Sequence, residues 1–167
     1  MRNKPIHSSP NYLKPYVLKP TLIPESFVLL QDTREQRPLF ARIPKGLTIQ
    51  STTLINGDYS VKGFEDKICF ERKSHDLFPY CSTERDKTVK KMLRFRNFEF
   101  VGLIIEMREA EIYQFQEYTK VHPEVIRGAL VSFAVRYNVH VYFGTRDSCA
   151  RWLLDHAVKF YNVKHEV

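Results

Sequence analysis

A short stretch of the chain, residues 57–76, carries acids and a lysine that strand geometry would bring together. Residues 68–73 combine β-branched and aromatic side chains after a turn sequence, which predicts a strand. Side chains alternate between the two faces of a strand, so Glu71 and Lys73 share one face. Asp58 begins the preceding predicted strand. The sequence therefore predicts two carboxylates and one ammonium group at a single place.

Such a cluster suits phosphodiester hydrolysis. Two carboxylates about 4 Å apart repel by about 4 kcal/mol at an effective dielectric near 20, and a cation relieves this repulsion. Mg²⁺ takes oxygen ligands and is commonly held by one or two carboxylates together with substrate phosphates. A lysine beside it can orient or deprotonate the attacking water and offset the charge on phosphorus. The alternative is an exposed Glu-x-Lys pair, which is solvated and contributes little.

Three short motifs resemble those of a known family. Gly57-Asp58-Tyr59 followed by Glu71-Arg72-Lys73 resembles the catalytic signature of the XPF-type structure-specific nucleases, a branch of the restriction-endonuclease-like superfamily. Upstream, Asp32-Thr33-Arg34-Glu35 resembles the first acidic motif of that family. The resemblance extends over roughly residues 26–160. It implies an α/β fold with a restriction-endonuclease-like core, in which a mixed central β-sheet is flanked by helices.

The resemblance also implies roles for the acids. Asp58 and Glu71 would bind Mg²⁺ or Mn²⁺ directly. Asp32 and Glu35 would add metal ligands or hold metal-bound water. These four residues are the predicted acidic part of the site.

The neighbouring cations are assigned in the same way. Lys73 would position the nucleophile, Arg72 would brace the site or contact phosphate, and Arg34 would contact DNA or form a structural ion pair. One position departs from the family pattern, which places an aspartate where this chain has Leu77. The nearest aspartate, Asp76, precedes that position by one residue. Either Asp76 takes that part through a local shift, or the carboxylate is missing here.

Composition agrees with a nucleic-acid partner. The chain has 167 residues, enough for one sizeable core, and a net charge of +7 with a pI near 9.3 favours DNA first and an anionic membrane second. The three cysteines match no zinc or disulfide spacing, which indicates reduced thiols. No stretch approaches the roughly 20 apolar residues of a membrane span. We expect an intracellular, DNA-associated protein with no membrane partner.

The chain divides into a Pro-rich basic arm, residues 1–25, and a nuclease domain, residues 26–167. The arm would follow DNA, wrap a partner or form a flexible tail. Asn56-Gly57 suits a tight hairpin turn, so the middle three strands are expected to form an antiparallel meander. The predicted strands are 27–31, 47–55, 59–61, 68–73, 100–105 and 139–143, and the predicted helices are 83–94, 123–137 and 148–161.

The predicted helix 83–94 is strongly basic. Val89, Met92 and Leu93 mark its expected buried face. Its cations would grip DNA phosphates or form an ordinary solvated surface. These cations are Arg85, Lys87, Lys90, Lys91 and Arg94.

These features predict a metal-dependent endonuclease that hydrolyses DNA, and the resemblance adds branched DNA, such as flaps, forks and junctions, in repair or recombination. A non-catalytic DNA-binding or scaffolding subunit is the alternative, because the resembled family includes inactive partners. A sequence-specific restriction-type enzyme would apply the same chemistry to another substrate. The resemblance further implies a homodimer or heterodimer through the C-terminal helices, with Tyr137, Trp152 or Tyr161 as contacts.

Overall fold

The computed structural model describes residues 18–166. Most of the predicted N-terminal arm, residues 1–17, therefore lies outside the described residues. The chain that follows runs along the last helix, where Arg151 donates a hydrogen bond to the carbonyl of Lys19 and Thr21 donates one to Asp155.

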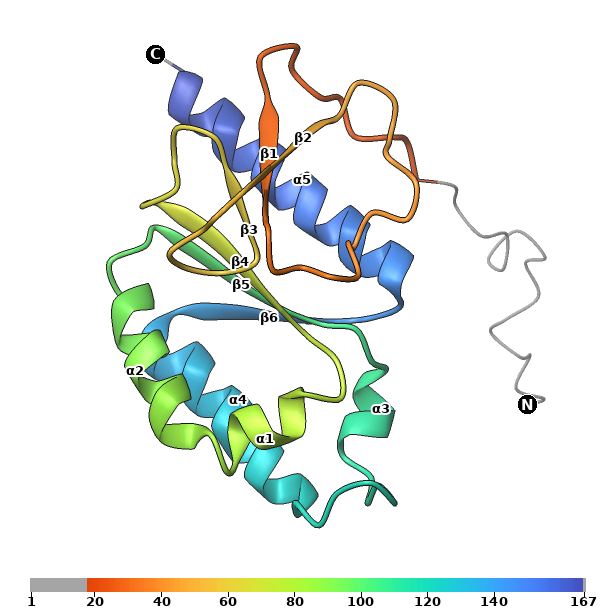
Figure 1. Ribbon diagram of the computed structural model, residues 1–167, viewed down its shortest axis with the longest axis vertical. Helices are drawn as coiled ribbons and strands as arrows, with labels where there is room; N and C mark the ends of the chain where they lie inside the picture. Colours follow the sequence, from red (N-terminus) through yellow and green to blue (C-terminus); the bar gives the residue numbers. More distant parts are fainter. Residues whose placement is uncertain (1–17, 167) are drawn as a thin grey trace, which may run out of the picture.

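A six-stranded mixed sheet forms the centre of the molecule (Figure 1). Its strand order is β2-β1-β3-β4-β5-β6. β3 runs antiparallel to both of its neighbours, whereas β1 and β2 are parallel, as are β4, β5 and β6. The mixed sheet predicted from the sequence is confirmed. The strands are β1 (Val28–Asp32), β2 (Thr48–Thr52), β3 (Tyr59–Val61), β4 (Ile68–Lys73), β5 (Phe100–Ile105) and β6 (Val139–Phe143).

The predicted antiparallel pairing of β3 with β4 is confirmed, but the predicted pairing of β2 with β3 is wrong. β2 pairs with β1 in parallel at the edge of the sheet, and β3 lies between β1 and β4. Side-chain polarity explains this order, because β2 is polar and largely exposed while every residue of β3 is buried. The turn at Asn56-Gly57 is present, with Gly57 at a φ of 73°, but it connects two strands that do not pair.

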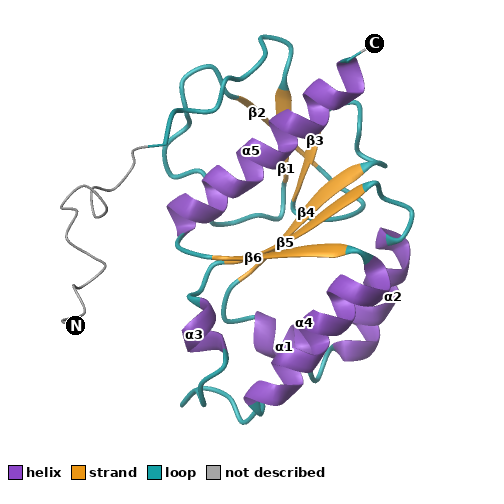
Figure 2. Cartoon of the chain, turned by 180° about the vertical axis from the view of Figure 1, so that it is seen from behind, coloured by secondary structure: helices purple, strands orange, loops and turns teal. Residues whose placement is uncertain are grey.

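Helices cover both faces of the sheet (Figures 1 and 2). α5 lies on one face, and α1, α2 and α4 lie on the other. The sequence predicted α2, α4 and a shorter form of α5 but missed the two short helices, α1 and α3. The helices are α1 (Leu77–Cys81), α2 (Arg85–Phe95), α3 (Glu109–Ile112), α4 (Pro123–Tyr137) and α5 (Arg146–His165). Within residues 18–166, no helix combines the length and apolar character that a membrane crossing requires.

The sheet separates two hydrophobic cores. β4 contributes to both, because Cys69 packs into the core beneath α1, α2 and α4, while Ile68 and Phe70 pack into the core beneath α5. This alternation confirms the predicted pattern of the strand. All three cysteines lie in the described part of the chain, buried and without a disulfide.

The buried face of α2 differs from the predicted one. Thr88, Met92 and Phe95 are buried, at positions i, i+4 and i+7, whereas Leu93 is 48% exposed. The rotation of the helix therefore differs from the expected one, which decides which of its cations faces the sheet.

Close packing at the centre of the sheet requires a glycine. Gly102 on β5 lies beside Phe70 on β4. A Cβ atom at Gly102 would lie 2.6 Å from Cδ1 of Phe70 and 2.9 Å from Cζ3 of Trp152. Trp152 is half-buried there and stacks on Tyr142, at 5.2 Å between ring centroids.

The other two aromatic residues considered for a dimer occupy different environments. Tyr161 is buried in the core beneath α5, edge-on to Phe27. Tyr137, at the end of α4, is half-buried and lies under the guanidinium of Arg96.

Candidate active site

The backbone holds Asp58 in place between two strands. Its amide donates to the carbonyl of Phe70 at 2.7 Å, and its carbonyl accepts from the amide of Asp32 at 2.8 Å. Its carboxylate Oδ2 accepts from the amide of Arg72 at 2.7 Å. The preceding Gly57 permits this approach, because a Cβ atom there would lie 2.8 Å from the carbonyl oxygen of Phe70. Asp58 is thereby fixed against β4 and the end of β1.

Glu71 is buried and lies between two lysines. Lys91, on α2, bonds both carboxylate oxygens of Glu71, at 2.6 Å and 2.7 Å. Lys73 lies 3.0 Å from Oε1 of the same carboxylate. The predicted convergence of Glu71 and Lys73 is present. The sequence placed Lys91 among the DNA-contacting cations and did not predict that it reaches this acid.

The surroundings of Lys73 stabilise its protonated, positively charged form. Burial acts to lower the pKa of Lys73, but the charges of three nearby carboxylates outweigh it and raise that pKa. A protonated lysine can orient a nucleophile and offset negative charge, but it does not serve as a base. The ammonium group also lies 5.0 Å from the ring centroid of Tyr80. The three carboxylates belong to Glu71, Asp76 and Asp58.

The charge balance around Asp58 suits a cation. Burial, and then the charge of Glu71, raise the pKa of Asp58 to about 6. Its second oxygen, Oδ1, accepts no hydrogen bond from residues 18–166. No group of three or more His, Cys, Asp or Glu side chains in this range is arranged to hold a metal ion. A pair of carboxylates matches the way Mg²⁺ is usually held, with water and substrate phosphate completing its ligands.

Asp32 lies at the end of β1, as predicted, but its carboxylate is occupied. Oδ1 accepts from the amide and from Nε of Arg34, at 2.8 Å and 2.7 Å. Oδ2 accepts from Nη2 of Arg34 at 2.9 Å and from the amide of Leu54 at 2.7 Å. The side-chain hydrogen bonds from Arg34 are the main cause that holds the pKa of Asp32 well below its usual value. Asp32 therefore fixes Arg34, whose side chain remains 72% exposed.

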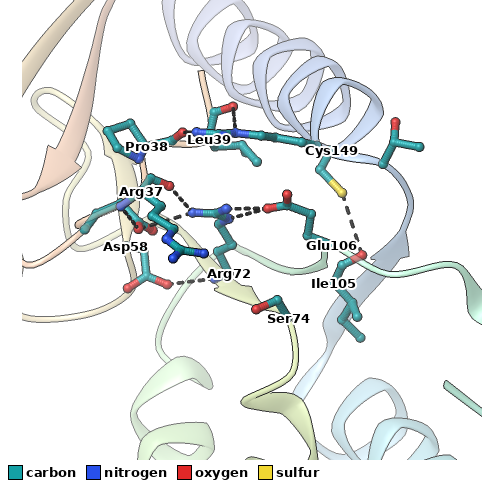
Figure 3. Close-up of polar contacts among 12 residues, drawn as sticks. Arg37, Pro38, Leu39, Asp58, Arg72, Ser74, Ile105, Glu106 and Cys149 are labelled. Carbon is teal, nitrogen blue, oxygen red and sulfur yellow. Dashed lines mark hydrogen bonds and ion pairs between the residues drawn. The ribbon is translucent and has the colours of Figure 1, made fainter. Parts of the chain in front are cut away.

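Arg72 points to the opposite face of β4 from Lys73 and ties three segments together. Its Nη1 lies 3.2 Å from Oε1 of Glu35 and donates to the carbonyl of Arg37, and its Nε donates to Glu106 at 3.0 Å (Figure 3). Burial acts to lower the pKa of Arg72, but bonds to these acids outweigh it and raise that pKa. Arg72 and Glu35 thus support the site together.

Asp76 lies beside Lys73 despite its shifted position in the sequence. Its Oδ2 is 3.1 Å from the ammonium of Lys73, and its Oδ1 accepts from the amide of Ser74 at 2.8 Å. The turn between β4 and α1 therefore supplies a carboxylate beside Lys73, and the role of Asp76 as the aspartate of the family pattern stays a prediction.

Two cavities share Lys73 as a lining residue, and cations line both. The first has a volume of about 340 Å³, and Arg34, Glu35, Gln36, Arg37, Asp58, Arg72, Lys73, Ser74 and Asp76 line it. The second has a volume of about 260 Å³, and Glu71, Lys73, Tyr80, Glu84, Lys87, Thr88, Lys91 and Arg94 line it. Among the predicted DNA contacts, Arg85 and Lys90 are exposed on α2 and line neither cavity.

Comparisons with known proteins agree with this geometry. The family model of the ERCC4 domain matches residues 31–155. XPF from Aeropyrum pernix in complex with DNA is 16% identical with a TM-score of 0.57, over 82% of this chain and 66% of that one. A second structure of XPF from Aeropyrum pernix is 18% identical with a TM-score of 0.61, over 80% of this chain and 61% of that one. The likeness to these two structures shows that this chain has the same fold.

The matched region thus spans just under two thirds of those solved chains. Among curated proteins, none matches this sequence significantly. The family model covers well over half of the chain and includes Asp58 and the Glu71-Arg72-Lys73 motif. The chain therefore belongs to the ERCC4 domain family, and its resemblance to the XPF-type nucleases is confirmed.

Proposed function

We propose that this chain is a divalent-metal-dependent endonuclease that cuts DNA at branched structures. One observation carries the proposal: Lys73 pairs with the buried Glu71 at 3.0 Å, and it lines one cation-rich cavity with Asp58 and a second with Glu71. Two acids and a cation on open, positively charged walls suit phosphodiester hydrolysis. A sugar or peptide substrate would not require such basic walls.

In this proposal, each side chain acts through the contacts described above. Asp58 and Glu71 hold Mg²⁺ or Mn²⁺, which supplies Lewis-acid stabilisation of the phosphate and lowers the pKa of bound water. Lys73 orients the nucleophile and offsets charge on the phosphate. Asp32 and Glu35 hold Arg34 and Arg72, respectively, through ion pairs. Asp76 keeps Lys73 in position.

The cations on both sides of the site would bind the DNA backbone. Arg34 and Arg37 lie on the side of the β1–β2 connection, and the basic residues of α2 lie on the other side. Support comes from the net charge of +7 and from the similar fold of XPF from Aeropyrum pernix, which was solved in complex with DNA. The predicted residues on α2 are Arg85, Lys87, Lys90, Lys91 and Arg94.

Branch preference and dimerisation rest on the family resemblance. We propose that a dimer through the C-terminal helices presents the site to flaps, forks or junctions. Size-exclusion chromatography with light scattering measures the dimer directly. A monomer at every concentration tested would remove this part of the proposal and leave the chemistry standing.

The experiment that tests the function is cleavage of end-labelled flap, fork, junction and plain duplex DNA with Mg²⁺ or Mn²⁺. Asp58→Asn and Lys73→Ala should each reduce the rate by at least about 100-fold, because each removes part of the charge arrangement at the phosphate. Lys159→Ala is the matched control, since Lys159 is 71% exposed on α5 and pairs with Glu166. Intact DNA with every substrate and metal would overturn the proposal.

A non-catalytic DNA-binding subunit is the second candidate, and one observation favours it. Both oxygens of Glu71 are bonded to lysine, so the acid is not free to bind a metal in this arrangement. This candidate predicts DNA binding that Asp58→Asn does not change and no cleavage under any condition. The cleavage experiment therefore separates the two functions.

A further inference from the structure

The contact between Lys91 and Glu71 places an ammonium group where the proposed metal would bind. The two N–O distances, 2.6 Å and 2.7 Å, show that Lys91 takes both carboxylate oxygens. Mg²⁺ binds oxygen at about 2.0–2.1 Å and needs the same lone pairs. A metal ion bound to Glu71 would therefore meet the ammonium of Lys91 at very short range. Lys91 and the metal compete for one carboxylate.

The local charge supports the same conclusion. Around the site, the carboxylates of Asp58, Glu71 and Asp76 are accompanied by the ammonium groups of Lys73 and Lys91. This set carries one net negative charge, so a divalent cation would reverse its sign. If Lys91 leaves, the remaining groups carry two negative charges, and a divalent cation neutralises them.

The ammonium of Lys91 can leave the carboxylate of Glu71 more easily than the ammonium of Lys73 can. The side chain of Lys73 is 13% exposed and has a second acidic partner, Asp76. The side chain of Lys91 is 28% exposed and pairs with Glu71 alone within residues 18–166. Lys91 also lies on the wall of the second cavity, next to Lys87 and Arg94. A rotamer change of Lys91 therefore moves its ammonium from a buried acid to a cationic surface.

We propose that Lys91 substitutes for the metal at Glu71 and that metal binding releases it to contact a DNA phosphate. This inference rests on the proposed function and adds its regulation. Metal binding and DNA binding are then coupled, because the metal frees a DNA-binding cation, and coupling between two sites is reciprocal. Without metal, the ion pair occupies both the carboxylate of Glu71 and the ammonium of Lys91. Lys91 is then not available to contact a DNA phosphate.

The test is Mn²⁺ binding to the full chain without DNA, measured by isothermal titration calorimetry and by electron paramagnetic resonance of free Mn²⁺. Lys91→Met keeps an unbranched side chain that is one atom shorter and removes its charge. It should bind Mn²⁺ at least about tenfold more tightly than the unmodified chain, because it removes a charged competitor from Glu71. Lys90→Met is the control, since it removes the same charge from an exposed neighbouring position.

The outcomes are distinct. A purely structural role for Lys91 would make Lys91→Met bind Mn²⁺ equally or more weakly, which would overturn this inference while the nuclease proposal stands. Equal tightening in Lys90→Met would show a general charge effect and would also overturn it. If neither the unmodified chain nor Lys91→Met binds Mn²⁺, both the inference and the metal-dependent function fail. Thermal unfolding of each variant checks that the fold is retained.

Discussion

The guanidinium of Arg72, at the end of β4, bonds the carboxylate of Glu106, the residue that follows the neighbouring parallel strand β5. The same guanidinium pairs with Glu35 and bonds the carbonyl of Arg37. One side chain therefore joins two strand ends to the loop after β1, and it does so on the face of β4 that is opposite to Lys73.

Removal of Arg72 should destabilise the fold as well as the site. We expect Arg72→Met to lower the free energy of unfolding by about 3 kcal/mol, because it leaves Glu35 and Glu106 partly buried without their cation. Arg72→Lys should recover only part of this loss, since an ammonium cannot bridge three acceptors in a plane. Urea denaturation measures both variants. Arg108→Met is the control and should cost less than about 0.5 kcal/mol, because Arg108 is 77% exposed and its ion pair is long.

The raised pKa of Asp58 predicts a specific pH dependence of stability. The pKa of Asp58 is about 6 in the folded chain, and the ordinary pKa of an aspartate is 3.8, so the folded state binds a proton more readily between these values. The free energy of unfolding should therefore fall as pH rises through this window, by at most about 3 kcal/mol from this group. Asp58→Asn removes the effect. The variant should be the more stable protein at about pH 7 and should match the unmodified protein at about pH 4.

Urea denaturation at several pH values between these limits measures this difference. Asp66→Asn is the control, because Asp66 is exposed on a turn and its side chain is 80% accessible. A difference between Asp58→Asn and the unmodified chain that does not change with pH would contradict the prediction.

Gly57 should be far less tolerant of substitution than Gly63. Both residues have positive φ, 73° and 86°, so alanine at either position is strained by about 1 kcal/mol. Only at Gly57 would a Cβ atom also meet the carbonyl oxygen of Phe70, whereas Gly63 has open space. Gly57→Ala should therefore cost at least about 2 kcal/mol and displace Asp58. Calorimetric unfolding compares the two variants, and equal losses would contradict the prediction.

Asp32 and Asp58 should differ in their effect on metal binding. The carboxylate of Asp32 bonds Arg34, so Asp32→Asn should weaken Mn²⁺ binding by at most about 100-fold, as expected for an outer-shell partner. Asp58→Asn should abolish it. Titration calorimetry with Mn²⁺ measures both. Loss of binding in Asp32→Asn equal to that in Asp58→Asn would identify Asp32 as a direct ligand.

Local patterns in the sequence were enough to predict the central part of the site. The alternation along β4 placed Glu71 and Lys73 on one face, and the 3.0 Å contact between them confirms it. The ends of β3, β4, β5 and β6 were also predicted correctly, because each strand is short and contains β-branched or aromatic residues that favour a strand. These features depend on neighbours in the chain, which the sequence displays directly.

Features that depend on distant contacts were not predicted. β2 lies beside β1 at the edge of the sheet, where its polar side chains remain exposed. The run of polar residues in β2 was the signal in the sequence for this edge position. The approach of Lys91 to Glu71 depends on the rotation of α2, which is set by the burial of Met92 and Phe95 in the core and by the hydrogen bond from Thr88 to the carbonyl of Tyr80. The expected face included the exposed Leu93, so Lys91 was not identified as the cation that turns inward.

The tight packing at Gly102 has a consequence for the history of the family. The ring of Phe70 and the indole of Trp152 occupy the space that a side chain at position 102 would need. A larger residue can enter that position only when one of the two rings has become smaller, so substitutions at 70, 102 and 152 should occur together across homologous sequences.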